Sequence, residues 1–349
     1  MPSLRSRILT SLLVTQLTLG ALIPLAANAA DSSQEEVTGL PFLTVRNKTN
    51  PNGSDPFFGK ERGSLKAGVC NIEKTTLGLL SSVSEAAPFY IPEEILRVGS
   101  VALMSPEALL REFGAATADK KPLLYTHGYY IDFEKGCRRA SVLREKTALN
   151  DQFLWYSWPS DGDLLNYPHD EADLYWSVPE LVRTILKLED QFGAGRVNLA
   201  GHSLGGRGMV VALNDVAARQ PDIQLGELVL LAPDMDFGIF QQMLPQIRPI
   251  VKGITLYVSD ADRPLAVSAS FHGYPRLGET GNDVASLKGV NVINLSDLPT
   301  RSPTGHLYHV YNDEVGADLD QLLNDGQQAD MRSNLVRTGE NTWSLQPAQ

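Results

Sequence analysis

Short apolar runs alternate with segments of helical periodicity along most of the chain. Six runs have the length of buried strands, and they are residues 123–126, 152–158, 197–200, 226–232, 253–259 and 289–295. Between most of them, apolar residues recur as they do on one face of a helix. Strands that alternate with helices form βαβ units, so the pattern predicts an α/β fold with a mostly parallel central sheet and helices on both faces.

The two ends of the chain do not show this alternation. Arg5 and Arg7 precede a largely apolar stretch at 8–25, and Ala27-Asn28-Ala29 has the form of a cleavage site. We therefore predict a signal peptide at 1–29 and an exported protein, periplasmic or secreted, that has no membrane span after cleavage. Composition further predicts a flexible leader at 30–57, a folded domain at 58–325 and a polar C-terminal tail at 326–349.

The sequence contains two cysteines, Cys70 and Cys137, and both lie in the part that would be exported. Disulfides form and persist in oxidising compartments. We therefore predict a Cys70–Cys137 disulfide, with two buried thiols as the alternative.

The segment Gly201-His202-Ser203-Leu204-Gly205 joins a predicted strand to a predicted helix. This G-x-S-x-G pattern, placed between strand and helix, is typical of a nucleophile elbow, in which a sharp turn exposes the serine hydroxyl. An ordinary tight turn would need the same glycines. The strand before the motif and the helix after it favour Ser203 as a catalytic nucleophile.

A serine nucleophile needs a base, and the base needs a carboxylate that orients it. In enzymes with this elbow the order along the chain is serine, acid, histidine. His306 follows the last predicted strand and is the preferred base; His309 and His272 are the alternatives. Asp262 follows the strand at 253–259 and is the preferred acid, with Asp260 and Asp234 as alternatives.

Two backbone amides must stabilise the oxyanion that forms on the substrate. We expect one from Leu204, directly after the nucleophile, and the other from Tyr129 in the loop after the strand at 123–126. Side chains that line a substrate pocket are harder to identify, and the candidates are Tyr130, Leu164 and Trp176.

Charge and motif content narrow the possible ligands. The formal net charge is −11 and no basic stripe is present, which argues against nucleic acid as a partner. Neither a dinucleotide fingerprint nor a phosphate loop occurs, so no cofactor is expected. His306 and His309 are three residues apart, but a third well-placed metal ligand is missing, and we predict no metal site.

Several segments in order resemble those of a known bacterial family. They are Tyr125-Thr-His127-Gly128-Tyr129, Trp155-Tyr-Ser157-Trp158-Pro159-Ser160, Gly201-His202-Ser203-Leu204-Gly205, Leu231-Ala-Pro233-Asp234-Met-Asp236, Leu256-Tyr-Val258-Ser259 and Gly305-His306. Together, over about residues 58–323, the chain resembles a family of α/β-hydrolase-fold proteins of largely unknown function. The resemblance implies an α/β-hydrolase fold and an esterase- or lipase-like serine hydrolase that uses Ser203, an aspartate and His306.

These inferences lead to an exported serine hydrolase that cleaves carboxylic esters through a Ser203–His306–Asp262 triad. Acidic residues between 160 and 176 disfavour anionic substrates, so a small uncharged ester or a lipid-like ester is expected. A thioesterase or amidase would use the same residues. The alternative from another class is a non-catalytic envelope protein that binds ligands on a hydrolase scaffold.

Overall fold

A computed structural model describes residues 38–49, 57–74, 92–163 and 166–347. The chain forms two units, Met1–Gln34 and Glu35–Gln349. The signal peptide predicted at 1–29 lies outside the described residues, and all that follows concerns the second unit.

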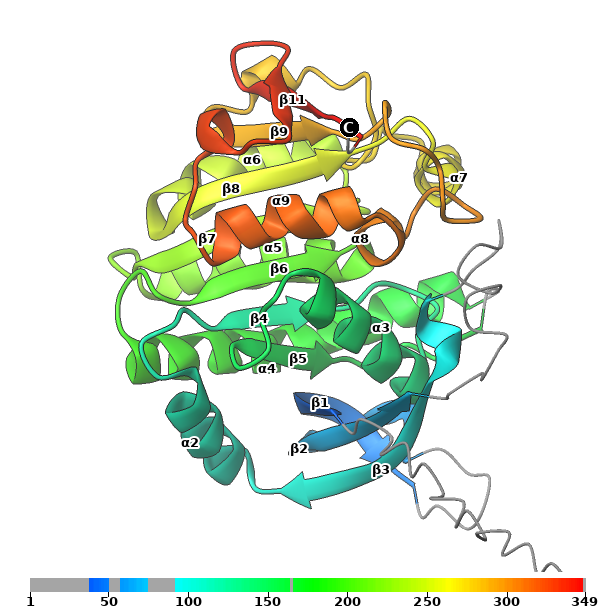
Figure 1. Cartoon of the computed structure of the whole chain (residues 1–349), viewed down its shortest axis with the longest axis vertical. Helices are drawn as coiled ribbons and strands as arrows, with labels where there is room; N and C mark the ends of the chain where they lie inside the picture. Colours follow the sequence, from blue (N-terminus) through cyan, green and yellow to red (C-terminus); the bar gives the residue numbers. More distant parts are fainter. Residues whose placement is uncertain (1–37, 50–56, 75–91, 164–165, 348–349) are drawn as a thin grey trace, which may run out of the picture. The chain divides into compact units, whose positions relative to one another are not determined.

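The core of this unit is a sheet with the strand order β10-β11-β9-β8-β7-β6-β4-β5-β1-β2-β3 (Figure 1). The strands are β1 (Thr38–Lys48), β2 (Phe58–Lys74), β3 (Leu96–Met104), β4 (Leu123–Thr126), β5 (Phe153–Ser157), β6 (Asn198–His202), β7 (Leu225–Leu231), β8 (Val251–Val258), β9 (Val290–Asn294), β10 (Leu335–Arg337) and β11 (Thr342–Leu345). The run from β11 to β1 is parallel, whereas β10, β2 and β3 pair antiparallel at the two edges. The predicted mostly parallel sheet is therefore confirmed.

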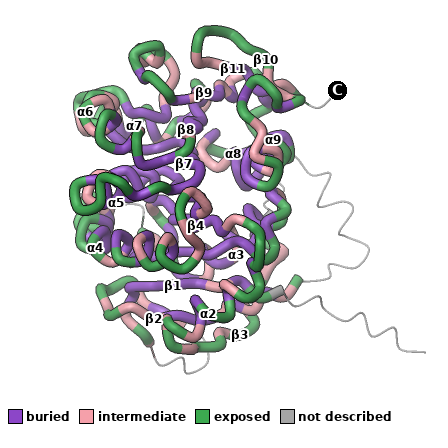
Figure 2. The backbone as a smooth tube through the Cα atoms, turned by 90° about the vertical axis from the view of Figure 1, so that its left-hand side faces the viewer, coloured by how far each residue is buried: buried purple, intermediate pink, exposed green. Residues whose placement is uncertain are grey.

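Helices cover both faces of the sheet, as predicted. They are α2 (Pro106–Thr117), α3 (Phe133–Lys146), α4 (Tyr167–Phe192), α5 (Leu204–Arg219), α6 (Phe237–Ile247), α7 (Arg263–His272), α8 (Tyr308–Tyr311) and α9 (Asp313–Leu323). Figure 2 shows α4, α5 and α6 on one side of the sheet and α3, α8 and α9 on the other. Within the described ranges, no helix combines the length and the apolar character that crossing a membrane requires.

Along each central strand, successive side chains point alternately into two apolar cores. Leu124, Leu154 and Leu199 belong to the core beneath α4, α5 and α6. Tyr125 and Trp155 belong to the core beneath α3 and α9. Because helices bury both faces of the central strands, those strands contain runs of consecutive apolar residues, such as 228–231 of β7, and these runs made them recognisable in the sequence.

Both ends of the described chain contribute to the sheet, which corrects the predicted domain limits. Residues 38–48, expected in a flexible leader, form β1 between β5 and β2, with Phe42 and Leu43 buried. Residues 335–345, expected in a polar tail, form β10 and β11, with Trp343 buried. The polar residues around these short apolar segments hid them, because composition averages over a whole region. The folded unit is thus wider than residues 58–325.

The structure contains the predicted disulfide between Cys70 of β2 and Cys137 of α3. Both cysteines are fully buried, where α3 packs on the sheet. The bridge joins an antiparallel strand near the sheet edge to a helix that covers the central strands.

Candidate active site

Ser203 lies at the sharp turn between β6 and α5. Its backbone has φ 54° and ψ −124°, a left-handed conformation that non-glycine residues rarely adopt and that costs of order 1–3 kcal/mol. The turn is held because Ser203 N donates to Leu231 O (2.9 Å) and Asp234 N donates to Ser203 O (3.1 Å). A Cβ added at Gly205 would lie 2.2 Å from His127 O, so this position of the motif requires glycine. The turn has the geometry of a nucleophile elbow.

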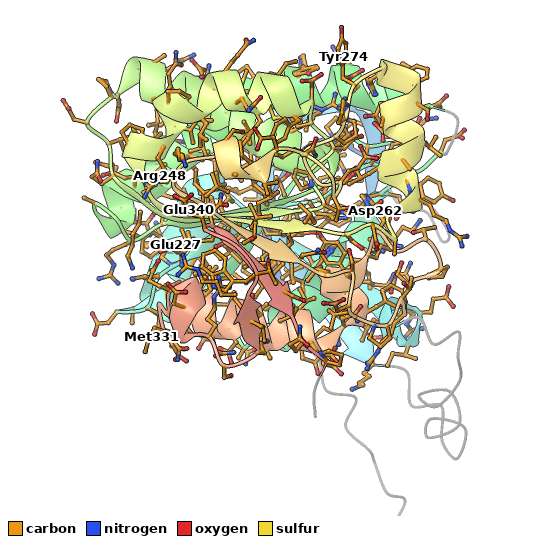
Figure 3. All side chains as sticks on the ribbon, turned by 90° about the horizontal axis from the view of Figure 1, so that it is seen from above. Glu227, Arg248, Asp262, Tyr274, Met331 and Glu340 are labelled. Atoms are coloured by element: carbon orange, nitrogen blue, oxygen red, sulfur yellow. A yellow bond between two sulfur atoms is a disulfide. The ribbon has the colours of Figure 1, made fainter. Side chains whose placement is uncertain are left out.

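Asp262 and His306 are brought together from loops that follow neighbouring strands. Asp262 follows β8 and His306 follows β9, and His306 Nδ1 donates to Asp262 Oδ2 at 2.7 Å. The Asp262 side chain is fully buried, whereas the His306 side chain is 12% exposed. In Figure 3, Asp262 lies at one end of the strands, and Glu227 and Arg248 lie at the other. The end with Asp262 is the carboxyl end of the parallel strands. Ligands of open α/β sheets bind at that end.

His202, the residue before Ser203, connects this pair to the elbow. Its Nε2 donates to His306 O at 3.2 Å, and the two rings lie 4.6 Å apart between centroids. Burial and the nearby histidines lower the pKa of His202 well below its ordinary value. The His202 ring is therefore neutral, and it places the His306 loop against the elbow.

The alternative bases have other environments. His309 is almost fully buried and packs on His202, with 4.2 Å between ring centroids, and burial lowers its pKa well below the ordinary value. His272 ends α7, where its Nδ1 lies 2.9 Å from Ser268 O. Of the three candidate histidines, His306 is the one bonded to a carboxylate that follows a strand.

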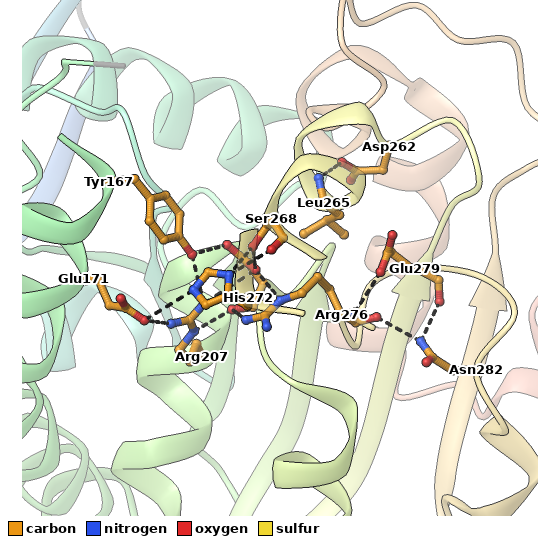
Figure 4. Close-up of polar contacts among 11 residues, drawn as sticks. Tyr167, Glu171, Arg207, Asp262, Leu265, Ser268, His272, Arg276, Glu279 and Asn282 are labelled. Atoms are coloured by element: carbon orange, nitrogen blue, oxygen red, sulfur yellow. Dashed lines mark hydrogen bonds and ion pairs between the residues drawn. The ribbon is translucent and has the colours of Figure 1, made fainter. Parts of the chain in front are cut away.

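Asp234, an alternative acid, is the centre of a buried ion-pair cluster. Its Oδ1 accepts from Arg276 Nε (2.7 Å) and Ser268 Oγ (2.6 Å), and its Oδ2 accepts from Tyr167 Oη. Figure 4 shows Tyr167, Arg207, Ser268 and Arg276 converging here from α4, α5, α7 and the segment after α7. Burial raises the pKa of Asp234, but Arg207 and Arg276 outweigh it and hold the pKa below its ordinary value.

The remaining alternative, Asp260, is exposed. Its backbone N–H donates to Ser296 Oγ at 3.1 Å. Asp262 alone of the three aspartates bonds to a candidate base.

The loop after β4 lies directly against the elbow. A Cβ added at Gly128 would lie 2.9 Å from Ser203 Cβ and 2.8 Å from His202 Nδ1. Leu204 begins α5, and the first N–H groups of a helix have no partner within it. Tyr129 follows Gly128, and its hydroxyl donates to Asp163 O at 3.2 Å. Leu204, one of the two expected oxyanion donors, therefore directly follows the nucleophile. The loop that contains the other, Tyr129, lies against it.

The candidate pocket residues are only partly placed. Tyr130 is 38% exposed, at the end of the loop beside Ser203. Leu164 lies outside the described residues. Trp176 lies on α4, and its ring contacts Arg62 of β2, whose guanidinium carbon is 5.4 Å from the ring centre. This contact involves none of the predicted triad residues.

An aromatic cluster beyond the three pocket candidates includes a residue of the oxyanion loop itself, Tyr129. The Tyr167 ring is 5.2 Å from that of Tyr129 and 6.4 Å from that of Phe271, between ring centroids. Phe271 is 69% exposed on α7, the helix that begins after Asp262. Tyr129 in the loop after β4 and Tyr167 at the start of α4 were visible in the sequence, but the contact of Tyr167 with α7 depends on tertiary structure.

One group of side chains has the composition of a metal site. Ligand atoms of Asp161, His169 and Asp170 lie within 4.8 Å of one another. Both oxygens of Asp170, however, already accept hydrogen bonds, one from Asp161 N (2.9 Å) and the other from Ser160 Oγ. We therefore assign no metal to this group.

A strained serine between strand and helix, with a carboxylate–imidazole pair beyond the next strands, defines an α/β-hydrolase. The chain belongs to the family described as "alpha/beta hydrolase of unknown function (DUF900)", whose model matches residues 104–325. Arg46, Cys70 and the strands β10 and β11 lie outside the matched range. No curated protein matched the chain.

Solved structures of similar fold are distant in sequence. A predicted CIB-like hydrolase from Thermoplasma acidophilum is 15% identical, with a TM-score of 0.37 over 64% of this chain and 90% of that one. A putative cell surface hydrolase from Lactobacillus plantarum is 13% identical, with a TM-score of 0.39 over 61% and 95%. An esterase from Pyrobaculum calidifontis is 15% identical, with a TM-score of 0.35 over 58% and 77%. Because these sequence identities and TM-scores are low, the fold assignment rests on the family match and on the chain's own topology.

Proposed function

We propose that this hydrolase is an exported serine esterase, in which Ser203, His306 and Asp262 act as nucleophile, base and orienting acid. The observation that carries the proposal is the 2.7 Å hydrogen bond from His306 Nδ1 to Asp262 Oδ2, beside a strained serine elbow. A proton on Nδ1 leaves the lone pair of His306 on Nε2, which is the nitrogen that must accept a proton from the serine hydroxyl.

The reaction has two halves. Ser203 Oγ attacks the ester carbonyl while His306 Nε2 takes the hydroxyl proton, and the oxyanion is stabilised by the amides of Leu204 and Tyr129. Collapse of this intermediate expels the alcohol, which receives the proton from His306, and leaves an acyl-enzyme. A water molecule then attacks the acyl group with His306 again as base, and Ser203 is released. Asp262 stabilises the imidazolium in both halves.

Substrate and location follow from charge and from the cysteines. The net charge of −11 and the carboxylates of Asp161 and Asp163, which act on Tyr129 in the oxyanion loop, disfavour anionic substrates, so uncharged esters are the substrates we propose. The rings of Tyr129, Tyr167 and Phe271 offer an apolar surface for an acyl or alcohol group. The signal peptide predicted at 1–29 and the buried disulfide support export to an oxidising compartment.

The test is labelling of the purified protein with a fluorophosphonate probe, together with kcat on p-nitrophenyl butyrate. Ser203→Ala should abolish labelling and lower kcat by at least about 10³-fold, because it removes the group that forms the acyl-enzyme. Ser344→Ala is the matched control, because both serines are 5% exposed and Ser344 lies on β11. Folded wild-type protein that neither labels nor hydrolyses esters, thioesters or anilides would instead indicate a binding scaffold.

A further inference from the structure

The Ser157-Trp158-Pro159-Ser160 segment takes no part in the triad, yet it contacts the loop after β4 along its length. Trp158 Nε1 donates to His127 O at 2.8 Å, and the Trp158 ring stacks on that of His127 with 5.0 Å between centroids and 11° between planes. At the other end of the loop, Ile131 N donates to Ser160 Oγ at 3.0 Å. The segment after β5 therefore holds residues 127–131 at both ends.

Asp170 of α4 supports the same loop from a second direction. Its side chain is buried, and it accepts hydrogen bonds from Ser160 Oγ, Asp161 N (2.9 Å) and Tyr130 N (3.4 Å). Tyr130 has φ 64°, a left-handed conformation that is strained for a tyrosine. Such strain persists only where the surroundings determine the backbone conformation, and the bond to Asp170 is part of those surroundings.

Arg46 of β1 completes the support from a third direction. It is 1% exposed, and its guanidinium donates to Ile131 O (2.7 Å), Ser160 O (2.7 Å) and Ser157 Oγ (2.9 Å). One buried cation thus joins the segments that follow β4 and β5. Burying a charge costs several kcal/mol before its hydrogen bonds are counted, so apolar side chains could fill this space at lower cost if packing were the sole requirement.

The supported loop touches the nucleophile. Gly128 is so close to the elbow that an added Cβ would lie 2.9 Å from Ser203 Cβ. From the other side, a Cβ added at Gly205 of the elbow would lie 2.2 Å from His127 O of the loop. A displacement of the loop backbone therefore changes its position relative to the Ser203 hydroxyl. Shifts of about 1 Å in catalytic groups can lower rates by about 10²-fold.

We infer that Arg46, Trp158, Ser160 and Asp170 are positioning residues, which hold the 127–131 backbone where it stabilises the oxyanion formed at Ser203. This inference rests on the proposed serine hydrolase reaction and adds to it the residues that set its oxyanion geometry. None of the four touches the reacting atoms; they act through the loop backbone.

The test compares Trp158→Phe, Ser160→Ala and Asp170→Asn with wild type. Trp158→Phe keeps an aromatic ring on His127 but removes the N–H donor. Each variant should lower kcat on p-nitrophenyl butyrate about tenfold to a hundredfold and leave KM within about twofold, because the lost interaction acts in the transition state. The inhibition constant of an alkylboronic acid, whose tetrahedral adduct with Ser203 places an oxygen where the oxyanion forms, should rise by the same factor.

Asp318→Asn is the control for a merely structural effect. Asp318 is a buried aspartate of α9 that accepts from Tyr257 Oη and from Arg332 Nη1 (2.7 Å), in the core beneath α9. This variant should lower the melting temperature while kcat and boronate inhibition stay at wild-type values.

The results separate the inference from the reaction on which it rests. Loop variants that lose thermal stability but keep wild-type kcat and boronate inhibition would overturn the inference, and so would a rise in KM at constant kcat. In both cases Ser203→Ala would still abolish turnover, so the proposed function would stand. A wild-type protein without labelling or turnover would overturn both.

Discussion

Asp234 follows β7, which lies beside β6, and Asp262 follows β8, the next strand in the sheet, but their partners give them different tasks. Asp234 bonds to Arg276 and contacts Arg207 at 3.5 Å, so its charge is balanced inside the protein. Asp262 bonds to a histidine and to Leu265 N, the first turn of α7. A carboxylate paired with two arginines cannot also stabilise an imidazolium, whereas one whose partner is a histidine can.

Asp262→Asn should lower kcat by about 10³–10⁴-fold, because an amide holds the imidazole in the wrong tautomer and cannot balance its charge. The free energy of unfolding should fall by less than about 1 kcal/mol, since asparagine also caps helices well. Steady-state kinetics and urea unfolding measure the two effects. Asp260→Asn, at the exposed neighbour, should change neither quantity.

Asp234→Asn should give the opposite pattern. Removing one partner of a buried ion pair costs about 3–5 kcal/mol, so the urea midpoint should fall strongly. The folded variant should keep a kcat within about tenfold of wild type, because the proposed triad of Ser203, His306 and Asp262 is unchanged. A loss of kcat like that of Asp262→Asn, with unchanged stability, would make Asp234 the triad acid.

At the scale of elements, the parallel strands and the residues after them were readable from the sequence. Buried strands such as β5 consist mainly of consecutive apolar residues, and the order serine, acid, base selected Asp262 and His306. Arg46 was not found, because a single cation within an apolar segment gives no sign of its partners. Those partners, Ile131 and Ser160, are 85 and 114 residues away in the chain, and the contacts exist only once β1 has entered the sheet.

The disulfide joins two elements that belong to different parts of the sheet. It closes a loop of 67 residues, which on the chain-entropy model stabilises the protein by about 4 kcal/mol. The double variant Cys70→Ala/Cys137→Ala should lose roughly that amount in urea unfolding. Wild-type protein unfolded with a reductant should match the double variant, and equal stability of oxidised and reduced protein would contradict the prediction.

At the scale of the whole molecule, the sheet extends beyond the family match at both ends. Residues 104–325 include β4 to β9, while β1, β2, β10 and β11 come from outside this range. β11 pairs with β9, the strand that leads to the His306 loop, and buries Trp343 and Leu345. The C-terminal segment is therefore part of the core that supports the site.

Trp343→Ala should lower the free energy of unfolding by about 3–5 kcal/mol, because it leaves a cavity in this core. Val336→Ala on β10, where the side chain is 52% exposed, should change it by less than about 0.5 kcal/mol. Chemical denaturation of both variants measures the difference. Equal, small effects would mean that the C-terminal segment behaves as the loose tail that its composition indicates.

The two oxygens of Asp262 give the proposed mechanism one more property. Oδ1 caps the first turn of α7 and Oδ2 holds His306, so a single carboxyl group serves both a helix end and a catalytic base. When that turn frays, the carboxylate loses its anchor and the imidazole loses its orientation. Turnover in mild denaturant would then decline while the sheet is still intact. The enzymatic rate would therefore measure the local opening of α7, which amide hydrogen exchange also detects.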